Sequence, residues 1–230
     1  MKKLFAMLMF TALLPLLGFA DEAAAPAATE KYVAGTHYQV IPAPVRTANP
    51  DKIEVNEVFW YGCPHCLHFE PALEPWVKSL PSDVDFERTP AIWRPNMEAH
   101  SRIYYAAKQL GVLESMHPII FKAMQEEKQD LETEDQAAKL FAAHGVDEAA
   151  FRKAYNSFSV QSLTKQGDAR VRSYGVTGTP QLVINGKYLV GAGRKDESNP
   201  NSVNITQADM LEIASFLIEK ERKAMAGTKK

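Results

Sequence analysis

The spacing of apolar residues changes twice along this chain and divides it into segments of different structure. Residues 38–41, 52–61 (KIEVNEVFWY) and 84–88 are rich in apolar, β-branched and aromatic residues, which predicts strands. A helix is predicted to begin at Cys63, because Pro64 then falls in its first turn, where proline is favoured. Strand, helix and strand in this order predict a parallel βαβ unit.

Residues 97–172 carry a different pattern, in which apolar residues recur at helical spacing and no strand is predicted. One such face consists of Ile103, Ala106, Ala107 and Leu110. The segment 133–136 (TEDQ) resembles a capping box that opens a further helix. Because no fixed period is found, these helices are predicted to form an insertion and not a repeat array.

Strand signals return after residue 175 and are followed by one more helix. Residues 181–184 and 187–190 flank Asn185-Gly186, which is a strong signal for a two-residue hairpin turn. The final helix is predicted to begin near Thr206, with one apolar face formed by Met210, Ile213, Ala214 and Leu217.

These segments predict an α/β fold in which one domain carries a large helical insertion. The charged segment from residue 220 onwards is expected to fray. The predicted boundaries are a signal peptide at 1–20, a disordered lead-in at 21–35, the first part of the α/β domain at 36–96, the helical insertion at 97–172, the second part at 173–222 and a charged tail at 223–230.

The first twenty residues have the layout of a secretory signal. Lys2 and Lys3 precede an uncharged apolar run at 4–19, and Ala20 is a small residue before Asp21. A retained membrane anchor is the alternative, but the run is short for a bilayer span of about 20 residues. We therefore expect a cleaved signal and an oxidising compartment outside the cytoplasm, the periplasm.

The net charge argues against nucleic acid as a partner. The formal charge is −2 for the full chain, and removing residues 1–20, with two lysines and no acids, changes it from −2 to −4. No basic stripe offsets this mild acidity.

Both cysteines of the chain, Cys63 and Cys66, form one C-x-x-C motif where a predicted strand meets a helix. A thiolate is the nucleophile in disulfide exchange, and the N-terminus of a helix stabilises an anion at Cys63. Cys66, one turn into the helix, can resolve a mixed disulfide, and His65 can add positive charge or a hydrogen bond beside the Cys63 sulfur. Since stabilising the thiolate makes the disulfide more oxidising, the Pro64-His65 spacer indicates a disulfide donor.

Two other uses of a C-x-x-C pair were weighed. A structural zinc site needs four ligands, and the chain has no second cysteine pair, so no metal is expected. A purely structural disulfide across so small a loop would stabilise little, because the entropic gain grows with loop length.

A second candidate element is Thr179-Pro180, just before the predicted strand at 181–184. A proline at this place can adopt a cis peptide bond at small cost, although a trans bond is the default from sequence alone. A cis bond could expose the backbone of Thr179 to an extended substrate.

Three segments together resemble the DsbA family of periplasmic thiol:disulfide oxidants of Gram-negative bacteria. They are FWYGCPHC (59–66), HFEP (68–71) and GVTGTPQLVINGKY (175–188), and the order of strands, helical insertion, hairpin and helix matches as well. The resemblance implies a thioredoxin fold, with a central mixed sheet flanked by helices, interrupted by an all-helical domain. It also implies that Cys63 attacks, that Cys66 resolves, and that Thr179-Pro180 is a cis-proline loop beside the disulfide.

Two further residues are interpreted in the light of this resemblance. The family has an acidic residue beneath the active site where this chain has Glu57, which could shuttle protons or tune the thiols; an exposed glutamate on an edge strand is the alternative, and Glu54 is the weaker candidate. The best-known oxidants of the family carry Val where this chain has Thr179, so the reduction potential and partner preference can differ here.

The sequence therefore predicts a periplasmic dithiol oxidase that donates its disulfide to unfolded exported proteins. No dissociable cofactor is expected, and the resemblance implies reoxidation by a quinone-linked inner-membrane partner of the DsbB type. Nothing in the sequence demands more than a monomer. One alternative is a disulfide isomerase or reductase, although fewer than about 35 residues lie between the predicted cleavage site and the first core strand, too few for a dimerisation domain. The other is a holdase-like peptide-binding module.

Overall fold

A mixed sheet organises the computed structural model, which describes residues 30–193 and 201–228. Within those residues, five strands pair in the order β1-β5-β4-β2-β3, with β2 parallel to β3 and the other neighbours antiparallel. Their bounds are β1 Gln39–Val40, β2 Ile53–Phe59, β3 Val84–Pro90, β4 Gln181–Ile184 and β5 Tyr188–Gly191. The predicted βαβ unit and the hairpin are both confirmed.

Two helices cover one face of this sheet. Helix α1 (Pro64–Lys78) contributes Phe69 and Leu73, and α7 (Gln207–Thr228) contributes its predicted apolar stripe, to a core that also contains Ile53 and Val55 of β2. Because side chains alternate along a strand, Glu57 lies on the same face as Ile53 and Val55, under α1. The other face packs against the end of α6 through Val58, Val171 and Tyr174.

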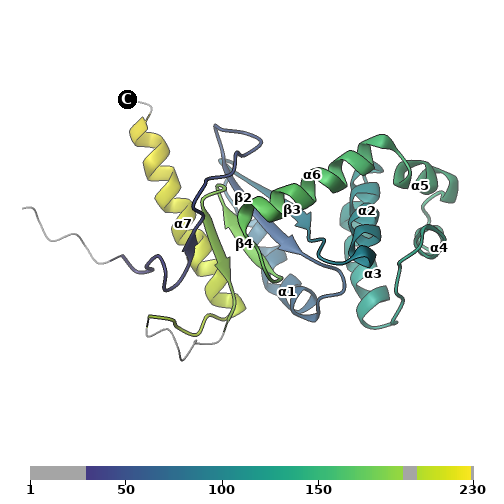
Figure 1. Cartoon of the computed structure of the whole chain (residues 1–230), viewed down its shortest axis with the longest axis horizontal. Coiled ribbons are helices and arrows are strands. Elements are labelled where there is room, and N and C mark those ends of the chain that lie inside the picture. Colours follow the sequence, from purple (N-terminus) through teal and green to yellow (C-terminus); the bar gives the residue numbers. More distant parts are fainter. Residues whose placement is uncertain (1–29, 194–200, 229–230) are drawn as a thin grey trace, which may run out of the picture. The chain divides into compact units, whose positions relative to one another are not determined.

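The remaining helices form the predicted insertion, and Figure 1 shows α2 to α5 grouped together with α6 running back to the sheet. Their core also takes in Phe59, Tyr61 and both cysteines, so the C-x-x-C motif lies where the insertion meets the sheet. The insertion comprises α2 Pro95–Gln109, α3 Leu113–Gln125, α4 Glu134–Ala143, α5 Glu148–Tyr155 and α6 Phe158–Tyr174.

Local signals in the sequence are confirmed in detail. Thr133 and Gln136 form the expected capping box at the start of α4. Asn185 and Gly186 both have positive φ, 51° and 63°, as the hairpin turn requires. The last pair before the turn is Ile184 with Tyr188, so the connection has three residues, 185–187, where two were predicted.

Two expectations at the chain ends are wrong. The C-terminal segment does not fray from residue 220, since α7 continues to Thr228. Glu221 is buried and accepts hydrogen bonds from Asn185 and Lys187, each at 2.6 Å, which ties the charged segment to the hairpin turn.

The predicted lead-in at 21–35 is also partly ordered. Tyr32 is buried, its hydroxyl donates to Glu212 at 2.7 Å, and its ring packs edge-on against Phe216. The predicted signal at 1–20 and the first part of the lead-in lie outside the described residues. Of the helices in the described ranges, none is long and apolar enough to cross a membrane.

Candidate active site

The turn between β2 and α1 places Cys63 at the start of the helix. Cys63 has an extended backbone and is the N-cap residue, and Pro64 takes the first helical position, as predicted. Gly62 is required in this turn, because a Cβ there would lie 2.2 Å from the Trp60 ring. The amides that follow Cys63 therefore begin the helix beside its sulfur.

The Cys63 thiol is an unusually strong acid for a cysteine. Its side chain is nearly buried, and Sγ lies 3.3 Å from the carbonyl oxygen of Thr179, to which the thiol donates. Hydrogen bonds from the Cys66 thiol, the Thr179 hydroxyl and the backbone N–H groups of Cys66 and His65 lower the pKa of Cys63 to about 5, against the opposing effect of burial. Near neutral pH the reduced protein holds a thiolate at Cys63.

Cys66 has the opposite character. It is completely buried, and burial, followed by its hydrogen bond to Cys63 and the charge of Glu57, raises the pKa of its thiol far above the usual value. Both cysteines are free thiols in this structure. An acidic thiol at the surface with a protonated thiol behind it can attack a disulfide and then resolve it.

The spacer residues Pro64 and His65 are exposed. The backbone N–H of His65 is one of the groups that lower the Cys63 pKa, while its carbonyl oxygen accepts from Gln207 Nε2 at 2.6 Å. The structure thus places the backbone of His65 against the sulfur and leaves the imidazole free to meet a substrate.

Thr179-Pro180 has the predicted cis peptide bond. Pro180 is buried and directly precedes β4, which pairs with β2, so the loop is carried to the end of the sheet where α1 begins. Both the carbonyl and the hydroxyl of Thr179 meet the Cys63 sulfur. The residue at which this chain differs from the best-known oxidants therefore contacts the reactive atom.

Glu57 is buried beneath this pair, and the exposed-glutamate alternative is wrong. Its side chain is 0 % exposed; Oε2 accepts from Arg88 Nε at 2.8 Å, and Oε1 has no hydrogen-bond partner among the described residues. Burial raises its pKa to about 8, although Arg88 opposes the shift. Glu54 is also buried, but it pairs with Arg170 of α6 instead of acting on the cysteines.

Sequence reasoning missed the partners of Glu57. Arg88 on β3 lies beside Glu57 in the parallel register and also binds Glu70 at 3.2 Å and Glu74 at 2.6 Å, both on α1. The signal was present only in part: Glu57 and Arg88 are the fifth residues of β2 and β3, whereas in the predicted strands 52–61 and 84–88 they are the sixth and the fifth, one residue out of the parallel register.

The insertion holds the turn before Cys63 through buried polar contacts that were also missed. Trp60 Nε1 donates to His100 Nδ1 at 2.9 Å, and the Tyr61 hydroxyl contacts His117 Nδ1 at 2.8 Å. Gln125 Nε2 donates to the Tyr61 carbonyl at 2.7 Å. Burial lowers the pKa of both histidines, so their imidazoles are uncharged at neutral pH. Across the described ranges, no three His, Cys, Asp or Glu residues are grouped to hold a metal ion.

The chain is similar in sequence and in structure to thiol:disulfide interchange proteins named DsbA. The family model of the DSBA-like thioredoxin domain matches residues 81–199. The thiol:disulfide interchange protein DsbA of Pseudomonas aeruginosa is 37% identical over 201 residues, covering 86% of this chain and 90% of the relative. That of Azotobacter vinelandii is 38% identical over 190 residues, covering 83% and 85%. The crystal structure of P. aeruginosa DsbA superposes with a TM-score of 0.78 at 37% identity, covering 88% of this chain and 99% of that one.

Proposed function

The chain belongs to the DsbA family of thiol:disulfide interchange proteins, and from this membership we propose how its residues carry out disulfide donation. The protein is a thiol:disulfide oxidoreductase that works as a dithiol oxidase in the periplasm. We assign Cys63 as the attacking thiol and Cys66 as the resolving thiol because their acidities differ: the Cys63 pKa is lowered to about 5, while the Cys66 pKa is raised.

The reaction proceeds by two exchanges of sulfur. A substrate thiolate attacks Sγ of Cys63 in the Cys63–Cys66 disulfide; that S–S bond breaks, and the Cys66 sulfur leaves and takes up a proton. A second substrate thiolate then attacks the substrate sulfur of the mixed disulfide, and Cys63 leaves as a thiolate. Two electrons pass to the enzyme and the substrate gains a disulfide. The low pKa of Cys63 makes it a good leaving group, which favours release of the oxidised product.

Glu57 is placed to manage the proton of Cys66. With a pKa of about 8 it holds a proton near neutral pH, and once ionised its charge raises the pKa of the Cys66 thiol. We assign it the transfer of that proton when Cys66 leaves or attacks. Thr179-Pro180 would bind the substrate chain in extended form, because the Thr179 carbonyl lies at the sulfur that forms the mixed disulfide.

The partners follow from the same proposal. Substrates are unfolded exported proteins with cysteine thiols, and a quinone-linked membrane oxidase of the DsbB type reoxidises Cys63–Cys66, so that no dissociable cofactor is needed. The protein acts as a monomer and reaches the periplasm through the cleaved signal predicted at 1–20.

The deciding experiment is the reduction potential, measured by equilibration with glutathione and followed by tryptophan fluorescence. A potential well above that of the glutathione couple is expected for a donor. A value near that of thioredoxin would instead support the isomerase or reductase alternative.

The role of the His65 imidazole is tested in the same assay. His65→Leu removes the imidazole and keeps the backbone N–H at the sulfur, and we expect a less oxidising protein. An unchanged potential would assign the tuning to the backbone alone.

A further inference from the structure

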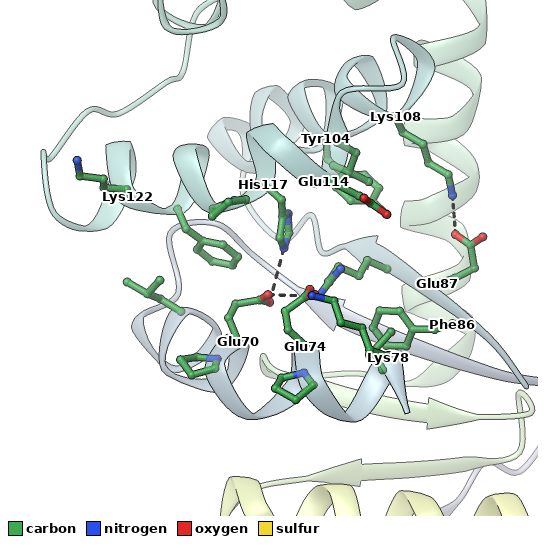
Figure 2. A pocket seen from close by; sticks show the side chains of 18 of the residues that line it. Glu70, Glu74, Lys78, Phe86, Glu87, Tyr104, Lys108, Glu114, His117 and Lys122 are labelled. Carbon is green, nitrogen blue, oxygen red and sulfur yellow. Dashed lines mark hydrogen bonds and ion pairs between the residues drawn. The ribbon is translucent and has the colours of Figure 1, made fainter. Parts of the chain in front are cut away.

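Polar contacts hold helix α1 on two sides, and one of them reaches its first turn. On the side that faces β3 and α3, Glu70 and Glu74 form ion pairs with Arg88, and Figure 2 shows both carboxylates on this side. They lie further along the helix than the cysteines. On the side of α7, Gln207 Nε2 donates to the carbonyl oxygen of His65 at 2.6 Å, between the two cysteines. The contact from α7 is therefore the one that touches the reactive turn.

The backbone that carries Gln207 is fixed on both sides of it. Gln207 is the first residue of α7, and Thr206 and Asp209 cap that helix reciprocally, through hydrogen bonds of 2.8 Å and 3.1 Å between the backbone N–H of each and the side chain of the other. Ile205 exchanges two backbone hydrogen bonds with Gly193, at 2.9 Å and 3.0 Å. The side chain of Gln207 thus starts from a defined place and loses little freedom when it binds.

The atom that Gln207 contacts belongs to the same peptide group as a donor to the reactive sulfur. The carbonyl of His65 and the N–H of Cys66 form one amide, and this N–H is among the donors that lower the pKa of Cys63. The same N–H lies 3.1 Å from the Cys63 carbonyl oxygen. A hydrogen bond to the oxygen of an amide polarises the group and makes its N–H a stronger donor. Gln207 is therefore coupled to the sulfur through a single amide.

The chemistry of the contact fixes its direction and limits its size. A carbonyl oxygen only accepts, so Gln207 must present its amide nitrogen, and the second lone pair of the oxygen leaves room for the N–H of the helix. Gln207 is half-buried and His65 is exposed, so water can take the place of a missing donor in part. The effect on the sulfur is accordingly expected to be smaller than that of a donor in direct contact with it.

We propose that Gln207 is a positioning residue for disulfide exchange, which holds and polarises the His65–Cys66 peptide so that the Cys66 N–H stays directed at the Cys63 sulfur. This inference rests on the proposed function, in which Cys63 is the attacking thiol and the leaving group. Because stabilising the thiolate favours the reduced protein, the contact makes the disulfide a stronger oxidant. The tuning of the sulfur thus extends to a residue 142 positions away from His65, on another helix.

The test is Gln207→Met, which keeps the length of the side chain and removes its donor. Cys63 should become an acid about two- to threefold weaker, as measured by thiolate absorbance at 240 nm against pH. The equilibrium constant with glutathione should shift by the same factor, toward a less oxidising protein. Unchanged acidity together with an unchanged glutathione equilibrium would overturn the proposal.

Ser215→Ala is the matched control, because it removes another hydrogen bond between the same two helices. Trp76 Nε1 of α1 donates to Ser215 Oγ of α7 at 3.0 Å, away from the first turn. This variant should leave the acidity of Cys63 unchanged. If Ser215→Ala and Gln207→Met weaken the acid alike, Gln207 acts only by docking α7 against α1, and the proposal fails.

The amide proton of Cys66 gives a direct readout in the ¹⁵N-labelled reduced protein. Its resonance should move upfield in Gln207→Met, since a weaker hydrogen bond leaves the proton more shielded, and it should stay in place in Ser215→Ala. An unmoved resonance in Gln207→Met would refute the coupling. The unmodified protein separates the two levels of the argument: an ordinary acidity of its Cys63 would defeat the proposed function and this inference together, whereas an acidic Cys63 that is unaffected by Gln207→Met would defeat this inference alone.

Discussion

The two sides of the C-x-x-C motif differ sharply although they are one helical turn apart. On the Thr179 side, Cys63 meets a carbonyl, a hydroxyl and two backbone N–H groups, and its pKa is lowered to about 5. On the Glu57 side, Cys66 is enclosed by apolar side chains above a buried carboxyl group, and its pKa is raised.

The difference shows what sets thiol acidity in this site. Both cysteines are buried, with exposures of 8 % and 0 %, and burial alone raises the pKa of either. Cys63 becomes acidic because hydrogen-bond donors converge on its sulfur and outweigh burial. Hydrogen bonds to the Cys63 sulfur, together with the burial of Cys66 and the charge of Glu57 beside it, thus separate the attacking thiol from the resolving one.

The largest effects on activity are expected when either cysteine of the motif is replaced by serine. Cys63→Ser should abolish disulfide donation, because the remaining Cys66 is fully buried and has no partner with which to form the disulfide that is donated. Cys66→Ser also loses the disulfide but keeps the Cys63 thiolate, which should attack a disulfide of another protein and remain in the mixed disulfide, because no Cys66 thiol is left to resolve it; non-reducing gels and mass spectrometry would detect the trapped species. Full oxidase activity of Cys63→Ser would contradict the assigned roles.

The two sides should also impose opposite pH dependences on stability. Cys63 has a folded pKa of about 5, below its usual 9.0, so its contribution grows as pH rises from 5 to 9. Glu57 has a folded pKa of about 8, above its usual 4.5, so its contribution is present at low pH and is lost as pH rises through 8. Between pH 5 and pH 8 the two effects oppose one another in the reduced protein.

Replacing Glu57 separates these effects. Reduced Glu57→Gln should gain on the order of 4 kcal/mol of unfolding free energy between pH 5 and pH 8, while the reduced parent protein changes little. Urea denaturation at several pH values measures both, and Cys63→Ser is the control that removes the rising contribution. Parallel curves for Glu57→Gln and the parent would mean that Glu57 titrates normally.

The Thr179 hydroxyl accounts for a smaller part of the contrast. Thr179→Val removes one donor to the thiolate and should raise the Cys63 pKa by about one unit, making the protein about 30 mV less oxidising. Thiolate absorbance at 240 nm against pH gives the pKa, and Thr179→Ser, which keeps the hydroxyl, is the matched control. If Val and Ser behave alike, the hydroxyl does not tune the sulfur.

The smallest effect is expected where the insertion holds the turn before Cys63. Gln125→Met removes the donor to the Tyr61 carbonyl and should cost about 1 kcal/mol of stability. If this contact also positions the turn, the Cys63 pKa should shift by a few tenths of a unit. Lys139→Met, an apolar replacement elsewhere in the insertion, should leave that pKa unchanged.

The order of elements and the reactive pair could be predicted from the sequence because their signals are local. Alternating apolar residues, the Asn185-Gly186 turn and the 133–136 capping box each act within a few residues, and the structure confirms them. Cys63 and Cys66 were identified by their spacing alone.

The surroundings of the pair could not be predicted in the same way, because they depend on contacts between distant segments. His117 and Gln125 lie more than fifty residues after Tyr61, and no pattern in the sequence marks them as its partners. The prediction that the charged C-terminal segment frays was wrong for the same reason. Glu221 has its hydrogen-bond partners in the hairpin turn, and the composition of the segment does not reveal them.

The pairing of Glu57 with Arg88 also bears on how the sheet can assemble. A slip of one residue between β2 and β3 would bring Glu57 beside Glu87 or Thr89 and leave a buried carboxylate without its guanidinium partner. The contact between Glu57 and Arg88 therefore fixes the register of β2 and β3 without any contribution from the Cys63–Cys66 disulfide. A protein that supplies disulfides to other chains can, on this account, align its own central strands correctly before either of its cysteines has been oxidised.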